Sequence, residues 1–123
     1  MDASKTISSS IVTAKDVTTF VHCTSFFDRH VVGIAQLSKF GTWIEGWCEE
    51  SADGNVLFQT KVLLGKRDDP ILHIYARQII EKIVSSSTSR KPLLLSISLQ
   101  PDSHDAITMQ DILNKVFEIN TWQ

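Results

Sequence analysis

Residues 56–76 read VLFQTKVLLGKRDDPILHIYA, and the hydrophobic period changes within this stretch. Before Gly65 the residues follow the alternating, β-branched pattern of a strand. After Gly65 the apolar residues recur at the spacing of a helix. Asp69 suits the N-cap of that helix, and Pro70 suits its first position, where a missing N–H costs nothing. The stretch therefore predicts a strand that leads through a short loop into a helix.

The residues on either side extend this pattern in both directions. Upstream, strand-like runs joined by short polar turns are expected over 17–26, 31–37, 42–49 and 56–64. Downstream, the helix is expected to end in the serine-rich loop 85–89, and a further strand over 92–100 and a helix after Asp105 follow. The predicted order is β-β-β-β-α-β-α. Residues 1–10 are polar and rich in serine, so they are predicted to form a disordered tail before a single domain over 11–123.

Hairpin-connected strands followed by helices are typical of an α+β fold. We predict a mostly antiparallel sheet of five to six strands with two helices on one face. The opposite face should be polar in a solvated monomer, yet apolar residues occupy both faces of the predicted strands. An uncovered apolar face of this size is typical of a protein interface, so a second sheet is expected to pack on it. The alternative is that the tail or the loop 85–91 folds over this face.

Composition argues against several classes of protein. The chain has 123 residues and a formal net charge of −2, with no basic region to bind nucleic acid. Its longest apolar runs are far shorter than a membrane span, and the first residues lack the basic and apolar regions of a secretory signal. Cys23 and Cys48 have no CxxC partner, which favours reduced thiols in the cytoplasm or nucleus.

Catalytic and cofactor motifs are scarce. Gly65-Lys66 lacks the upstream glycine and the following Ser or Thr of a phosphate-binding loop. The four histidines and two cysteines do not fall at metal-ligand spacing, so no metal and no cofactor are expected. His22 and Cys23 are adjacent on a strand, and their side chains therefore point to opposite faces. A small enzyme that uses Cys23 or Cys48 stays open as an alternative, and it would require a thiol of low pKa in a cleft.

Several segments together resemble the proteasome assembly chaperone 3 family. The most specific is Thr60–Gly65, TKVLLG, followed by Pro70–Ala76, PILHIYA. Upstream, Val21–Phe26 resembles a Val-x-Cys-Thr-x-Phe strand of that family, and Lys39–Thr42 resembles its Lys-x-Gly-Thr turn. Downstream, the Leu93–Leu95 run and Trp122 resemble the start of its last strand and its terminal tryptophan. The loop Lys66–Asp69 is one residue longer than in the family, and residues 45–56 match poorly.

The resemblance implies a non-catalytic chaperone that forms a heterodimer with proteasome assembly chaperone 4. It also implies that the pair holds α-type proteasome subunits, notably the fifth, while the α-ring closes. A homodimer of the chain without its partner is compatible with the same fold. On this basis the residues expected at a sheet-to-sheet dimer interface are Phe20, Phe26, Ile34, Trp43, Trp47, Leu57 and Leu63.

A client surface should be polar and smaller than the dimer interface, because a chaperone must release its client. Three charged or polar loops, 28–30, 66–69 and 85–91, fit this description. The residues expected to contact the client are Asp28, Arg29, Lys66, Arg67, Asp68, Arg90 and Lys91. A homodimeric adaptor or scaffold subunit of another complex would show the same sequence pattern, and it is the main alternative function.

Overall fold

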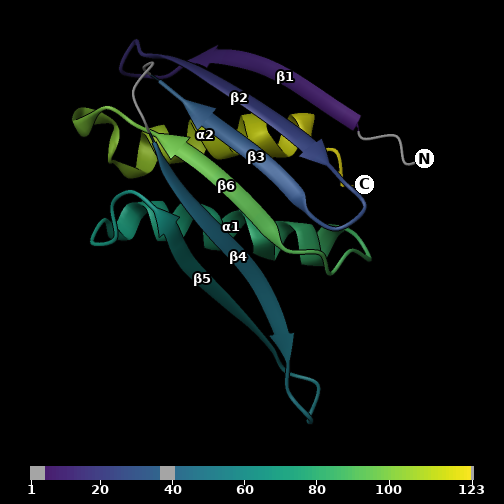
Figure 1. The fold of residues 1–123 in the computed structure, drawn as a ribbon. Helices are drawn as coiled ribbons and strands as arrows, with labels where there is room; N and C mark the ends of the chain where they lie inside the picture. Colours follow the sequence, from purple (N-terminus) through teal and green to yellow (C-terminus); the bar gives the residue numbers. More distant parts are fainter. Residues whose placement is uncertain (1–4, 37–40, 123) are drawn as a thin grey trace.

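The computed structural model describes residues 5–36 and 41–122. They form six strands, two α-helices and one short 3₁₀ helix, drawn in Figure 1. The elements, in chain order, are β1 (Lys5–Val12), β2 (Thr18–Ser25), β3 (His30–Ala35), β4 (Thr42–Glu50), β5 (Val56–Leu64), α1 (Pro70–Ser86), β6 (Leu93–Ser98), η1 (Pro101–Ser103) and α2 (Ala106–Ile119).

The six strands form one sheet in the order β1-β2-β3-β6-β4-β5. Every neighbouring pair is antiparallel except β3 and β6, which run parallel in the middle of the sheet. Both helices lie behind the sheet in the view of Figure 1, where α1 covers β4, β5 and β6 and α2 covers β1 and β2. The predicted α+β class, with a mostly antiparallel sheet and two helices on one face, is confirmed.

The first strand corrects the prediction of a disordered tail over residues 1–10. Lys5–Val12 pairs antiparallel with β2, and Ile7 and Ile11 pack against the core. Thr6 and Thr24 also share a hydrogen bond of 3.0 Å between their hydroxyl oxygens. Serine has a weak strand preference, so the alternation of the two isoleucines is hidden in the sequence by the serines between them. Residues 1–4 lie outside the described part of the chain.

The helix that the opening stretch predicts begins at Pro70, as expected. Its buried side includes Leu72, Tyr75, Ile79 and Ile83, so the helical stripe read from the sequence is the one that contacts the sheet. The helix ends at Ser86, within the predicted serine loop. There the hydroxyls of Ser86 and Ser87 donate to the carbonyl oxygens of residues 82 and 83, at 2.5 and 2.6 Å. The hydroxyl of Ser87 therefore satisfies a carbonyl that the helix end would leave without a partner.

The register of β3 corrects a second prediction. Ile34 was expected on the open face, but it pairs with Val21, and Val32 on the same side of β3 pairs with Cys23. Paired residues of neighbouring strands point to the same face, and Val21 faces the helices. Ile34 is accordingly only 1% exposed. The run Val31–Ile34 is apolar or glycine at every position, so hydrophobic alternation cannot decide which residues point inward.

Candidate functional site

The face of the sheet opposite the helices is open and carries large apolar side chains. Phe20 is 58% exposed and Leu57 is 54% exposed, and Trp43 and Leu63 are exposed on the same face. Trp47, also on this face, is half-buried and donates its indole N–H to Glu49 at 3.0 Å. Five of the seven predicted interface residues therefore share this face. No described residue covers them, so neither β1, which extends the sheet at its edge, nor the loop 85–91 folds over it.

The other two predicted interface residues lie elsewhere. Ile34 is buried against the helices, so its assignment to this interface was wrong. Phe26 follows the last residue of β2 and is partly exposed at the end of the sheet.

A bulge adds one residue that sequence reasoning missed. Trp43 pairs with Leu64, whereas the next residue, Ile44, pairs with Val62. Leu63 is therefore an extra residue in β5, and both it and Leu64 are exposed, Leu64 to 65%. Strict alternation would have turned Leu64 inward. The only local signal is the Gly65 that follows, whose backbone has a positive φ of 109°.

Small and polar residues separate the apolar residues of β4 and β5 from Phe20 on β2. A shallow hollow of about 370 Å³ lies there, lined in part by Ser8, Gly33 and Ser96. The imidazole of His22 lies directly over Gly33, where an added Cβ would approach a ring carbon to 2.0 Å. Glycine at this position therefore lets the ring lie flat on the sheet. The open face is thus two apolar areas with a polar hollow between them.

Two of the three predicted client loops meet at one end of the sheet. The ammonium of Lys91 donates to the carbonyl of Phe26 at 2.8 Å, and the amide of His30 donates to the carbonyl of Pro92 at 2.9 Å. Arg29 forms an ion pair with Asp28 at 3.2 Å in the turn between β2 and β3. These contacts bring Asp28, Arg29, Arg90 and Lys91 into one region.

His30 lies in the buried part of this end of the sheet and contacts several segments there. Its Nδ1 lies 2.8 Å from the hydroxyl of Ser25, and its Nε2 lies 2.8 Å from the hydroxyl of Ser89. The edge of its ring meets the indole of Trp122, which in turn donates to Ser86 at 3.2 Å. Burial, with a smaller contribution from the charge of Lys91, lowers the pKa of His30 below its usual value. Neutral His30 therefore joins β3 to the loop after α1 and to the end of the chain.

The third predicted loop, Lys66–Asp69, lies at the opposite end of α1. The helix has 17 residues, so the two ends are about 25 Å apart at 1.5 Å per residue. The predicted client residues Lys66, Arg67 and Asp68 thus belong to a second, separate region.

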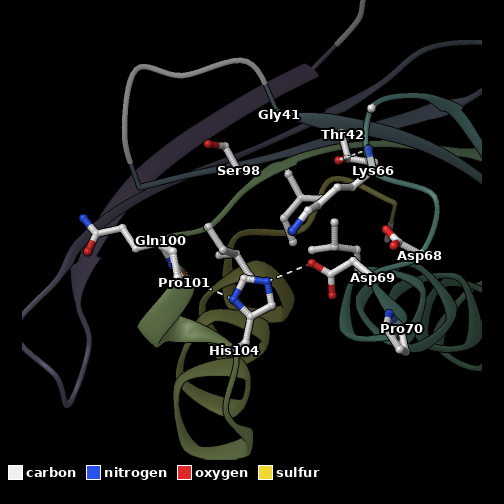
Figure 2. A pocket seen from close by; sticks show the side chains of 14 residues that line it. Gly41, Thr42, Lys66, Asp68, Asp69, Pro70, Ser98, Gln100, Pro101 and His104 are labelled. Atoms are coloured by element: carbon white, nitrogen blue, oxygen red, sulfur yellow. Dashed lines mark hydrogen bonds and ion pairs between the residues drawn. The ribbon is translucent and has the colours of Figure 1, made fainter.

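A pocket of about 900 Å³ opens beside this loop, between the start of α1 and the end of β6 (Figure 2). Leu72, Ile97 and Leu99 contribute apolar walls. Nε2 of His104 lies 2.9 Å from Oδ2 of Asp69, and its Nδ1 lies 3.1 Å from the carbonyl oxygen of Gln100. The carboxylate of Asp69 therefore accepts from His104 although its backbone occupies the N-cap of α1. His104 and Asp69 are thus partners of one another, as in a structural clamp between two helix starts.

The described residues do not support the enzymatic alternative. Burial raises the pKa of the Cys23 thiol to about 12, so it is not a thiolate nucleophile at neutral pH. Cys48 is half-buried at the far end of β4. Among the residues that the structure describes, no group of three His, Cys, Asp or Glu side chains is arranged to hold a metal ion. Within the same residues, no helix is long and apolar enough to cross a membrane.

Comparisons with known proteins agree with this picture of a binding module. The sequence profile of the proteasome assembly chaperone 3 family matches residues 32–119. Proteasome assembly chaperone 3 of Bos taurus is 33% identical over 100 residues, which cover 79% of this chain and 80% of the relative. The Homo sapiens protein of the same name is 30% identical over 93 residues, covering 74% and 75% of the two chains.

The fold also matches a solved structure. A chain in the crystal structure of a novel chaperone complex for yeast 20S proteasome assembly superposes with a TM-score of 0.64 and 15% sequence identity. The match covers 96% of this chain and 98% of the yeast chain. At this identity the likeness establishes a shared fold.

Proposed function

This chain belongs to the proteasome assembly chaperone 3 family, and on that premise we propose that it is a non-catalytic chaperone for assembly of the proteasome core particle. It acts as a heterodimer with proteasome assembly chaperone 4. The heterodimer binds α-type subunits, notably the fifth, while the α-ring closes.

The observation that carries the proposal is the uncovered apolar face of the sheet. Phe20, Trp43, Leu57, Leu63 and Leu64 are exposed together on a face that the chain's own helices do not cover. Transfer of such surface out of water contributes about 25 cal/mol per Å², so a partner sheet that covers it gains a large, lasting stabilisation. Aromatic residues at the centre of a contact are also the type that dominates binding energy. A permanent chaperone partner fits this face better than a client that must leave.

The client is proposed to bind at the ends of the molecule. The loops there carry charged residues of both signs, and polar contacts of this kind favour fast, reversible association. One region contains Asp28, Arg29, Arg90 and Lys91, and the other contains Lys66, Arg67 and Asp68.

Affinity capture of the tagged chain from its own cell extract, followed by mass spectrometry, tests the proposal. We expect a small chaperone partner together with α-type subunits and few β-type subunits. Double substitution Trp43→Ser and Leu57→Ser should remove the partner, whereas Ile107→Ser, at an exposed position on α2, should retain it. Recovery of the chain alone, or of an unrelated complex, would favour the homodimeric adaptor instead.

A further inference from the structure

The hairpin of β4 and β5 extends past the rest of the sheet as a two-stranded arm. β4 pairs with β6 only over Thr42–Gly46, while its pairing with β5 continues to Glu50 and Val56. In the described part of the chain, the outer half of β4 is therefore paired on one side only. Figure 1 shows the two strands projecting well beyond their neighbours. We refer to residues 47–59 as the arm.

An arm of this kind has little support of its own, because an isolated two-stranded ribbon is marginally stable in water. At its base Phe58 packs against the margin of the core. At its tip the amide of Ser51 donates to the carbonyl of Asn55 at 2.8 Å, and the side-chain amide of Asn55 donates to Asp53 at 3.0 Å. Between base and tip the arm relies on the pairing of its two strands and on the ion pair of Glu50 with Arg90.

The arm is apolar on one face and negatively charged. Trp47 and Leu57 lie on the face that continues the open face of the sheet. Residues 47–59 contain three carboxylates, Glu49, Glu50 and Asp53, and no lysine or arginine. Hydrogen bonding by Ser51 lowers the pKa of the Asp53 carboxyl, which keeps it ionised at neutral pH. Arg90, from the loop after α1, forms an ion pair of 3.5 Å with Glu50, the last residue of β4 before the tip of the arm.

We propose that the arm clasps the chaperone partner that covers the open face, and that it binds a lysine- or arginine-rich segment of that partner beside the sheet-to-sheet contact. The inference rests on the proposed heterodimer. The partner on the open face is the expected binding partner of the arm, because Trp47 and Leu57 extend the same face as Trp43 and Leu63. The net charge of the arm suggests the chemistry of the bound segment. Arg90 offsets the charge of Glu50 alone, and Glu49 and Asp53 leave the arm negative, which complements a basic surface. A second copy of this chain would instead bring a second negative arm to the contact.

The test uses the purified complex of this chain with proteasome assembly chaperone 4 of the same organism. Backbone amides of 47–58 should exchange quickly in the free chain and at least tenfold more slowly in the complex. Glu49→Lys with Glu50→Lys should raise the dissociation constant about tenfold at low salt, and the difference should shrink at high salt. The matched control is Glu81→Lys with Glu118→Lys, which changes the net charge equally on the helices and should leave affinity within twofold.

A second variant with its own control tests the apolar half of the contact. Leu57→Ala should weaken the complex about tenfold, whereas Ile107→Ala, at an exposed site on α2, should have no effect. If wild-type chain does not bind chaperone 4, the proposed heterodimer fails and the arm's role fails with it. A different outcome is that the chain binds while the arm amides exchange as fast in the complex as in the free chain and every arm variant binds as well as its control. In that case only the arm's role is overturned. Protection of the arm solely by α-type subunits, or by self-association of the chain, also overturns it.

Discussion

The Nε2 atom of His104 lies 2.9 Å from Oδ2 of Asp69, so one hydrogen bond joins the start of α1 to the turn before α2. The two groups come from positions 35 residues apart. Both are partly buried, with side-chain exposures of 28% for His104 and 12% for Asp69. Such a bond fixes the relative position of the two covering helices.

Replacement of His104 by alanine should lower the free energy of unfolding by about 1 kcal/mol, the usual contribution of a partly buried side-chain hydrogen bond. The substitution removes the ring that lies between Asp69 and the Gln100 carbonyl. Urea denaturation measures it. Arg77→Ala removes an exposed ion pair to Glu81 within α1 and should cost no more than about 0.5 kcal/mol. Equal effects of the two substitutions would argue against a structural clamp.

Stability should decrease in mild acid because of His30. Its pKa is lowered in the folded protein, so below about pH 6.5, the ordinary histidine pKa, the unfolded chain binds more protons than the folded chain. The stability that neutral His30 contributes is therefore fully present above that pH, and it is lost as the pH falls toward the pKa of His30 in the folded protein. Unfolding measured by denaturant at pH 7.5, 6.5 and 5.5 should show the decline. His30→Gln should flatten the profile, and an unchanged slope in this variant would assign the decline to other groups.

Gly65→Ala should destabilise the chain by about 3 kcal/mol. The backbone there has a φ of 109°, and an added Cβ would approach the Cα of Thr42 to 2.8 Å, so strain and a backbone clash combine. Gly54 is the matched control. It has a φ of 89° but no atom within 4 Å of an added Cβ, and Gly54→Ala should cost only about 1 kcal/mol. Thermal unfolding compares the two, and similar losses would show that the contact with Thr42 contributes nothing.

Charge reversal at Lys66 and Arg67 should weaken binding of α-type subunits and leave the chaperone dimer intact. The reason is their position on a loop beyond the edge of the open face, about 25 Å from the Lys91 end along α1. Binding of the purified heterodimer to isolated α-type subunits gives the measurement. Arg29→Glu with Lys91→Glu reverses the same number of charges at the opposite end. Unchanged client affinity in both variants would remove the loops from the client surface.

The sequence predicts most of this fold because its strongest signals are local. The change of period at Gly65 places α1, and the apolar stripe of Ile79 and Ile83 identifies its buried side. Two features are not local and were missed. The serines of β1 become a strand only through pairing with β2, and the inward side of Val31–Ile34 is set by register with neighbouring strands.

The candidate surfaces were predictable in kind and less so in detail. Alternation places Phe20 and Leu57 on the open face correctly, yet it cannot foresee the bulge that exposes Leu64. Loop charges identify Lys66 and Lys91, but their separation depends on the length and direction of α1. The arm could not be predicted from the sequence, because its length depends on how far β6 pairs along β4.

The central parallel pair has a consequence for synthesis on the ribosome. β6 occupies the middle of the sheet between β3 and β4, yet among the six described strands it is translated last. Until Leu93–Ser98 emerges, the β1–β3 meander and the β4–β5 hairpin have no strand between them, and both present unpaired inner edges to solvent. The nascent chain is therefore most prone to aggregation just before Leu93–Ser98 appears, at a synthesis rate of about 5–20 residues per second.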